Sequence, residues 1–456
     1  KGYLSSDSYE TNRLMVLDDI DKFIKTVVDS KGNAADILIV SPIVSSNAYR
    51  KGERLAPIIY RDSSDRISGL LKSATTRREG IIANLDIAPF ISEYFGCSTD
   101  NYVGQSFKVV HANDNYEFIK KLNKYTAFIY MNRTEVLSIF AIYEILIVIL
   151  IFIILQLKPK NNKLNNLYRF LILSNIAIPI ALLLLPVLWP DTLLKAIVEM
   201  LVLTGILTII AAIFKKERID GVILLTGLTC ALLSADIMLG STLIKNGFLG
   251  YDPIIGARYY GIGNEYMGIL IGCTLVFSTA ILDRFKLSKW TVSLIYALII
   301  IAIGYPGFGA NVGGSITAVF AFLFVMFKLY NERLKIKHIL FIIIAVPIFI
   351  GLLALIDIYI LTDTSHLGNA IGQIRAGGID VIISIIIRKV SMNIKLFNVS
   401  IWSKVLVISL GVLGLLFYRP FGVAKQVFNK YKNLKIGLQG LLVACVVTFL
   451  VNDSGV

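Results

Sequence analysis

The sequence predicts a polytopic α-helical membrane protein, preceded by a smaller α/β domain. Of the 456 residues, 56% are hydrophobic and only 17% are charged, a composition that soluble globular domains do not have. Long apolar runs recur from Ala141 onward, as expected for helices that cross a bilayer. The residues before that point are mixed in polarity. We therefore expect a polar domain over residues 1–132 and a transmembrane domain over residues 133–456.

About ten segments are predicted to span the membrane. They lie at 136–157, 170–189, 192–214, 221–240, 265–283, 290–306, 315–327, 339–360, 403–417 and 436–451. The segments at 315–327 and 403–417 are short, so we expect them to extend into their flanks. The chain begins with Lys1 and stops soon after its last apolar run. We therefore expect it to be a fragment, with a partial N-terminal domain and a truncated C-terminus.

Lys and Arg are unevenly distributed among the loops that join these segments. Alternate loops (158–169, 215–220, 284–289, 328–338 and 418–435) hold 19 of them, whereas the opposite loops and the tail hold six. Cytoplasmic loops of membrane proteins carry this kind of excess. The pattern predicts a multi-pass protein of the plasma membrane, with its N-terminal domain and its C-terminal tail outside.

The same loop pattern accounts for the net charge of +14. The sequence therefore predicts the lipid bilayer as a partner and no nucleic acid. Four cysteines lie apart without a CxxC motif, and three histidines are dispersed along the chain. We expect no metal site and no cofactor.

The N-terminal domain shows alternating helix and strand patterns. They are an amphipathic helix at 16–30, buried strands at 35–43 and 54–62, and a second helix at 84–96. Asp86 is expected to cap the second helix and Gly96 to end it. Buried strands that alternate with helices predict an α/β sheet.

The stretch GLLKSATTRREGIIANLDIAPFISEYFG (Gly69–Gly96) resembles the C-terminal part of alkaline-phosphatase-like enzymes. That superfamily includes phosphatases, sulfatases and phosphoglycerate mutases, which use metal ions to hydrolyse esters. Ser41–Val44 stands where the family would have its metal-binding Asp-His pair, and the family's nucleophile would precede Lys1. The resemblance therefore implies a degenerate, non-catalytic domain of that fold.

Arg77 and Arg78 are adjacent within this stretch. Two guanidinium groups can hold an anion through bidentate hydrogen bonds. A solvated turn is the alternative, and the sequence favours it.

The stretch YDPIIGARYYGIGNEYMG (Tyr251–Gly268) places four polar side chains at the outer end of a predicted span. Snorkelling at the interface accounts for Arg258, and a favourable position in the first helical turn accounts for Glu265. Neither explains why Asp252, Arg258, Asn264 and Glu265 occur together. We interpret them as a substrate-binding group, with Glu265 as a candidate catalytic carboxylate.

Three more polar stretches are predicted on the outer side, at Gly304–Ser315, Ser365–Gly378 and Asn452–Gly455. They contribute Asn311, Arg375 and Asn452 as candidate substrate-binding residues, and His366 and Asp453 as candidate acid–base residues. Each also has a structural interpretation, as a tight interhelical turn, a surface loop or a helix end.

The motifs RYYGIGNEYMG and GANVGGS resemble the outer motifs of the O-antigen ligase and polymerase class, which transfers glycans from a lipid diphosphate carrier. Glu265 and the absence of an Arg at Asn311–Ser315 depart from that class. The whole chain also resembles an uncharacterised bacterial membrane family, which pairs an alkaline-phosphatase-like outer domain with these polar motifs.

The sequence thus favours an integral membrane protein of the bacterial envelope that acts as a transferase or hydrolase on a lipid-linked or cell-envelope glycan substrate. One alternative is a transporter or flippase of an envelope lipid precursor, for which the intramembrane acid Asp236 is the best candidate. The other is a non-catalytic membrane scaffold.

Overall fold

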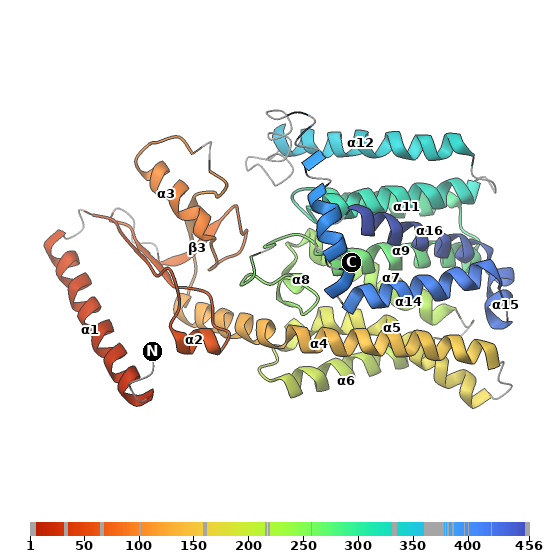
Figure 1. Cartoon of the computed structure of the whole chain (residues 1–456), viewed down its shortest axis with the longest axis horizontal. Coiled ribbons are helices and arrows are strands. Elements are labelled where there is room, and N and C mark those ends of the chain that lie inside the picture. Colours follow the sequence, from red (N-terminus) through yellow and green to blue (C-terminus); the bar gives the residue numbers. More distant parts are fainter. Residues whose placement is uncertain are drawn as a thin grey trace.

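The structure is a computed structural model of the chain. It describes residues 6–31, 35–63, 68–99, 102–157, 162–214, 217, 219–256, 258–330, 335–359, 378, 380, 383–384, 387–395, 397–399, 401–420 and 422–451. Residues up to Asp114 form a domain that we name the outer domain after the side of the membrane predicted for it, and helices α4 to α16 form the helical bundle. Figure 1 shows the two parts side by side, with α4 running from the outer domain along the bundle.

The helical bundle contains long helices together with the short helices α8 and α15. They are α4 (Asn115–Leu157), α5 (Asn162–Leu188), α6 (Leu193–Ile213), α7 (Asp220–Met238), α8 (Thr242–Asn246), α9 (Asn264–Phe285), α10 (Lys289–Gly304), α11 (Val312–Tyr330), α12 (Ile336–Tyr359), α14 (Ile401–Tyr418), α15 (Gly422–Lys430) and α16 (Lys432–Val451). Helix α4 is continuous through residue 133, so the domain boundary predicted from composition falls inside a helix.

Each of the ten predicted spans overlaps one of these helices. In the described part of the chain, eight helices are long and apolar enough to cross a membrane: α4, α5, α6, α7, α9, α11, α12 and α16. Helix α10 has 16 residues, and the pair Ile387–Val399 and Ser403–Tyr418 is bent by 88°. The protein is therefore a helical membrane protein, and the larger number of ten spans stays a prediction.

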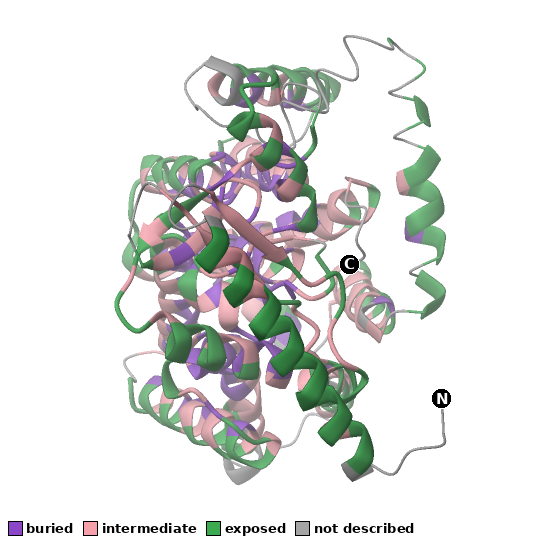
Figure 2. Cartoon of the chain, turned by 90° about the vertical axis from the view of Figure 1, so that its left-hand side faces the viewer, coloured by how far each residue is buried: buried purple, intermediate pink, exposed green. Residues whose placement is uncertain are grey.

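Helix α9 lies at the centre of the bundle and packs against α7, α10, α11 and α16. Its side chains Tyr266, Leu270 and Leu275 are completely buried, and Figure 2 shows buried residues gathered within the bundle. Small residues let neighbouring helices approach closely where lipid removes the hydrophobic drive for association. Gly437 of α16 is such a residue, because it lies directly against Thr279 of α9.

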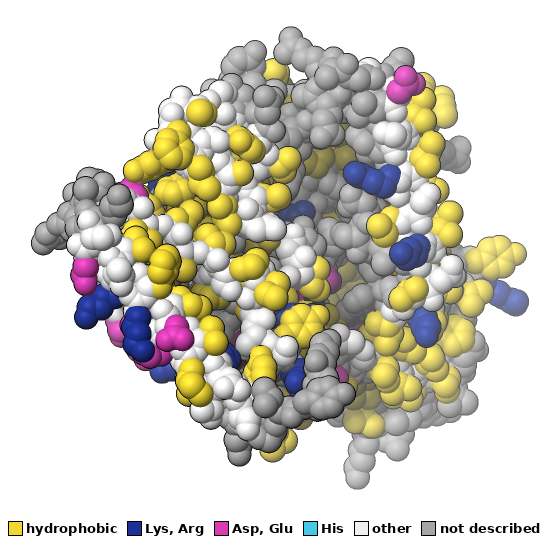
Figure 3. Space-filling view, turned by 60° about the vertical axis from the view of Figure 1, so that its left-hand side comes forward, with side chains coloured by type: hydrophobic (Ala, Val, Ile, Leu, Met, Phe, Trp, Pro, Cys, Tyr) yellow, Lys and Arg dark blue, Asp and Glu magenta, His cyan; other side chains and the backbone are white. Residues whose placement is uncertain are grey.

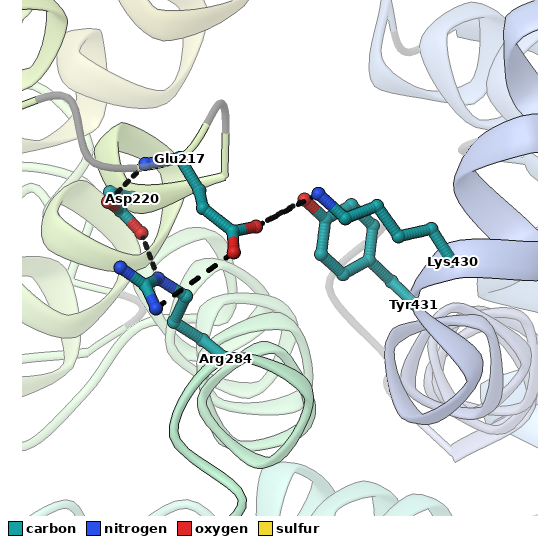
Figure 4. Close-up of polar contacts among 5 residues, drawn as sticks. All are labelled: Glu217, Asp220, Arg284, Lys430 and Tyr431. Carbon is teal, nitrogen blue, oxygen red and sulfur yellow. Dashed lines mark hydrogen bonds and ion pairs between the residues drawn. The ribbon is translucent and has the colours of Figure 1, made fainter.

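At the end of the bundle away from the outer domain, five polar side chains form one network (Figure 4). Asp220 accepts hydrogen bonds from the Glu217 backbone N–H at 2.7 Å and from Arg284 Nε at 2.8 Å. Lys430 Nζ and Tyr431 Oη each donate to Glu217 at 3.0 Å. The Lys430 hydrogen bond is the main cause that lowers the pKa of Glu217. Three loops predicted to be cytoplasmic therefore meet at one end of the bundle.

The outer domain is built from short elements. They are α1 (Ser6–Lys31), β1 (Ile37–Val40), α2 (Ser46–Arg50), β2 (Ile58–Arg61), β3 (Gly69–Ser73), the 3-10 turn η1 (Asn84–Asp86), α3 (Ile87–Tyr94) and β4 (Phe107–His111). Its described strands form two separate antiparallel pairs, with Ile37 opposite Arg61 in one and Gly69 opposite His111 in the other. The expectation of a single α/β sheet is therefore wrong for the described strands. No residue of β1 or β2 is fully buried, so the prediction of buried strands is wrong as well.

The predicted amphipathic helix at 16–30 is part of α1, which projects from the rest of the outer domain (Figure 1). Its apolar side chains Leu17, Ile20 and Phe23 are exposed, Phe23 by 68%. Figure 3 shows hydrophobic side chains interspersed with charged ones on this side of the molecule. The spacing of apolar residues predicted the helix correctly, because this pattern depends only on local periodicity.

We expect Gly437→Ala to destabilise the bundle. A Cβ at this position would lie 2.8 Å from the backbone oxygen of Leu275, which cannot move without shifting α9. Overpacking of this kind costs about 1–3 kcal/mol, and it outweighs the helix propensity gained from alanine. The measurement is thermal unfolding in detergent. Gly414→Ala is the control, because no atom lies within 4 Å of its Cβ position; equal stability of the two variants would contradict the packing argument.

Candidate functional site

A buried carboxylate fixes the turn that follows β3. Asp86 is completely buried and accepts hydrogen bonds from Ser73 Oγ at 2.7 Å, Thr75 Oγ1 at 2.5 Å, Ala83 N at 2.9 Å and Gln105 N at 3.0 Å. These bonds offset the cost of burying the carboxylate. Asp86 precedes α3 as expected, but its side chain makes no cap hydrogen bond there. The predicted cap position is therefore correct, but the carboxylate bonds to Ala83 N at the start of η1 and holds the turn in shape instead of capping α3.

Arg78 projects from this turn into the bundle. Its Nη2 donates to Asn246 Oδ1 at 3.1 Å and its Nη1 to the carbonyl oxygen of Lys245 at 3.5 Å, at the end of α8. Only 6% of Arg78 is exposed, and burial lowers its pKa. The interpretation of this pair as a solvated turn is wrong for Arg78, because the bundle provides acceptors that the local sequence does not contain.

Arg77 contacts a different part of the bundle. Its Nη1 donates to the carbonyl oxygen of Pro306 at 2.9 Å, and its guanidinium lies 4.0 Å from the ring centroid of Tyr260. Tyr260 and Pro306 belong to two of the polar stretches identified in the sequence. Arg77 therefore fastens the outer domain to both stretches, while the adjacent Arg78 fastens it to α8.

A cavity of about 930 Å³ lies where the outer domain meets the bundle. Its outer-domain wall includes the turn from Lys72 to Glu79, and its bundle wall includes residues 239–242, Lys245 and Asn246. The charged side chains in its lining are Lys72, Arg77, Arg78, Lys108 and Lys245, together with Glu79 and Glu93. Five cations and two acids leave a net excess of three positive charges. Such a surface favours an anionic ligand.

Lys245 is a partly buried cation of this cavity. Burial is the largest cause that lowers the pKa of Lys245 from 10.5 to about 8, and the nearby charge of Arg78 is the second. The charge of Lys72 also lowers this pKa, whereas the charges of Asp236 and Glu79 raise it. No ion pair of Lys245 is present among the described residues. Its ammonium group is therefore the one in this wall that gains most from a bound anion.

Asp236 is buried at the end of α7, where the sequence suggested a transport path. Both carboxylate oxygens accept backbone hydrogen bonds, Oδ1 from Leu243 N at 2.8 Å and Oδ2 from Ile244 N at 2.9 Å. The carboxylate thereby fixes the loop between α7 and α8. This contact explains the acid structurally and positions Ser241 and Lys245 in the cavity wall.

The structure brings Asn264 and Asn311 together. The Asn311 Nδ2 donates to the Ile262 carbonyl at 3.0 Å and to Asn264 Oδ1 at 3.4 Å, while its Oδ1 accepts from Gly314 N at 2.8 Å. The two stretches 251–268 and 304–315 are thus joined, as a shared site requires. The Asn311 Nδ2 makes this connection and its Oδ1 bonds to Gly314 in the same stretch, which supports its structural interpretation as a turn residue.

The other described candidates of this group lie near the same joint. Glu265 Oε1 forms an ion pair with Arg133 Nη2 at 3.0 Å. Asp252 is buried and accepts a hydrogen bond from Ile254 N at 2.8 Å, and burial raises its pKa. Arg258 is half-buried. None of Asp252, Arg258, Asn264, Glu265 and Asn311 lines the cavity, so the predicted group and the cavity are neighbouring features joined through Arg77.

Four predicted residues fall outside the described residues. They are His366, Arg375, Asn452 and Asp453. Among the residues that the structure describes, no cluster of His, Cys, Asp and Glu has the arrangement of a metal site.

The residues that sequence reasoning missed are Ser241, Lys245 and Arg133. Lys245 is one of only two Lys or Arg residues between 241 and 264, a loop predicted to lie outside. Loops on the outer side of a membrane protein carry few Lys and Arg residues, so a lysine in such a loop could have been identified as a candidate functional residue. Ser241 and Arg133 carry no comparable signal, because a single Ser after a helix and a single Arg within a helix are common.

Comparisons with protein-family models, with curated protein sequences and with solved structures found no match to this chain.

We expect Gly261→Ala to disrupt the joint between the two polar stretches. Gly261 has φ +77°, and a Cβ there would lie 2.8 Å from the backbone carbon of Gly309. A side chain meets both a left-handed backbone penalty and a backbone collision, so unfolding in detergent should occur at a lower temperature. Gly268→Ala, with no atom within 4 Å of its Cβ position, should be neutral or stabilising by about 1 kcal/mol. Tolerance of both substitutions would contradict this assignment.

We expect Lys245→Met to raise the thermal stability at pH 7. The pKa of Lys245 in the folded state is about 8, below the ordinary value of 10.5. The protonated lysine therefore lowers the free energy of unfolding, by its full amount below pH 8. This loss of stability declines as the pH rises from 8 toward 10.5. The gain should be about 2 °C or more at pH 7 and smaller at pH 9.5. The control is Lys195→Met, since Lys195 is half exposed and pairs only with Asp191 at 3.6 Å. A gain independent of pH would contradict the electrostatic cause.

Proposed function

We propose that the protein is a multi-pass plasma-membrane protein of the bacterial envelope, which acts as a transferase or hydrolase on a lipid-linked or cell-envelope glycan substrate. It crosses the membrane about ten times, with the N-terminal domain outside. The observation that carries the proposal is the cationic cavity at the contact between the outer domain and the bundle. An alkaline-phosphatase-like origin of the outer domain is part of the proposal and rests on sequence resemblance.

The position of the cavity fits a substrate that is anchored in the bilayer. Its bundle wall is formed by α8, by the loops after α7 and α10 and by the loop before α9, whereas its other wall belongs to the outer domain. A lipid carrier would remain among the helices while its polar group enters the cavity. The volume of about 930 Å³ is in the range of small-molecule sites.

The chemistry that these walls support is stabilisation of negative charge. Transfer from a lipid diphosphate develops negative charge on the leaving group, and Arg77, Arg78 and Lys245 are positioned to offset it. A catalytic acid or base remains part of the proposal. Glu265, Asp453 and His366 are its candidates, and Glu265 would act beside its ion-pair partner Arg133.

The proposal is tested in the bacterium that encodes the protein. Lys245→Gln and Glu265→Gln are introduced separately into the chromosomal gene, and the amount of each envelope glycan is measured alongside the membrane level of the protein. We expect a loss of at least about tenfold in one glycan for Lys245→Gln, because removing a cation at the developing charge typically lowers turnover by this amount or more. Glu265→Gln should have the same effect if this carboxylate is the base.

Lys195→Gln is the matched control, since it removes a cation near the same end of the bundle, outside the cavity lining. Unchanged glycans in both test variants at normal protein levels would refute the proposed function.

A further inference from the structure

Ser241 is a buried hydroxyl in the cavity wall without a partner. Only 1% of its surface is exposed, and its Oγ neither donates nor accepts a hydrogen bond among the residues that the structure describes. A buried hydroxyl left unpaired costs about 1–3 kcal/mol. Because native proteins rarely leave such groups unsatisfied, an orphan hydroxyl on a residue of a cavity wall indicates a position where a ligand makes the missing bond.

The backbone around Ser241 is held in an uncommon conformation. Gly240 has φ +95° and Ser241 has φ +59°, so two consecutive residues lie in the left-handed region. The Ser241 N–H donates to the Asp236 carbonyl at 2.6 Å, and the Asp236 carboxylate holds the next turn. For a serine this conformation costs about 1 kcal/mol. The surrounding contacts therefore maintain the hydroxyl in the cavity wall against a local preference.

Lys245 lies one helical turn beyond Ser241. Its backbone N–H donates to the Ser241 carbonyl at 2.9 Å, and residues four apart on a helix share one face. Both residues line the cavity, and Arg78 reaches the same turn from the outer domain. A hydroxyl donor and two cations thus occupy one part of the wall, and they come from both halves of the molecule.

The charge of the lining indicates which anion fits. Lys72 is paired with Glu79 at 3.1 Å, so Arg77, Arg78, Lys108 and Lys245 face Glu93 alone, again an excess of three positive charges. A single carboxylate would leave most of this excess uncompensated. A phosphate or diphosphate group carries about two to three negative charges and several acceptor oxygens, which match hydroxyl, ammonium and guanidinium donors together.

We propose that the cavity binds a phosphate or diphosphate group, which accepts hydrogen bonds from the Ser241 hydroxyl and the Lys245 ammonium, with Arg77 and Arg78 beside it. The natural source of this group, a lipid headgroup or a free phosphate, follows from the proposed function. The binding itself does not depend on that function being correct.

The experiment measures binding to the purified full chain in detergent by isothermal titration calorimetry, without phosphate or divalent metal in the buffer. The probes are inorganic pyrophosphate, farnesyl diphosphate and farnesol. We expect both diphosphates to bind and farnesol not to bind. An affinity at least about tenfold higher for farnesyl diphosphate assigns the group to a lipid, whereas equal affinities assign it to a free anion.

The variants separate ligand contacts from general stability. Ser241→Ala and Lys245→Gln should each weaken pyrophosphate binding about tenfold or more, and Lys245→Arg should recover part of the loss. Ser241→Gly removes the same hydroxyl and relieves the left-handed backbone, so it should bind as weakly as Ser241→Ala while unfolding at a higher temperature. Lys195→Gln should bind like the original chain.

Two results would overturn the inference. One is the absence of binding by both diphosphates, or equal binding of farnesol and farnesyl diphosphate. The other is binding that Ser241→Ala and Lys245→Gln leave unchanged. Diphosphate binding with these variant effects, but without any change of envelope glycans in the cellular experiment, would uphold the site and refute only the proposed function.

Discussion

The arrangement of the candidate site depends on the burial of Arg78 between the outer domain and the bundle. A guanidinium keeps its charge even where burial opposes it, so it needs acceptors wherever it is buried. Asn246 and the carbonyl of Lys245 supply them at the end of α8. Asp86 fixes the conformation of the turn that carries Arg78, through hydrogen bonds from Ser73 and Thr75. The contacts of Arg78 and of Asp86 together therefore set the distance between this turn and α8. The cavity is the space that this distance leaves open.

The bundle wall of the cavity is supported by polar groups behind it whose hydrogen bonds are satisfied. Asp236 accepts backbone N–H bonds with both carboxylate oxygens, and Asn311 donates across to the neighbouring loop with its Nδ2 and accepts from Gly314 of α11 with its Oδ1. These contacts hold the loops that carry the wall. Among the residues that the structure describes, the Ser241 hydroxyl in this wall has no hydrogen-bond partner and Lys245 has no ion pair. Pre-organised donors of this kind bind an anion without a large cost of rearrangement.

The two ends of the bundle use charge differently. At the end away from the outer domain, the two acids Glu217 and Asp220 neutralise the two cations Arg284 and Lys430 and tie α7, α9 and α15 together. At the other end, the cations of the cavity exceed the acids. The first arrangement holds helices in place, because each charge has an opposite neighbour. The second leaves a positive potential that only a further anion can offset.

The sequence by itself determined the long helices of the bundle, the two described polar stretches at 251–268 and 304–315, and the end of the helix at Gly96, whose φ is +69°. Each of these follows from neighbouring residues: apolar periodicity marks helices, Lys and Arg mark one set of loops, and a glycine adopts a left-handed backbone. Tertiary structure alone decided that Arg78 is buried, that Asp236 caps a loop, that the strands form two pairs and that Ser241 faces a cavity. Arg78 meets Lys245 across 167 positions of the chain, and contacts over such separations depend on packing, which leaves no periodic trace in the residues nearby.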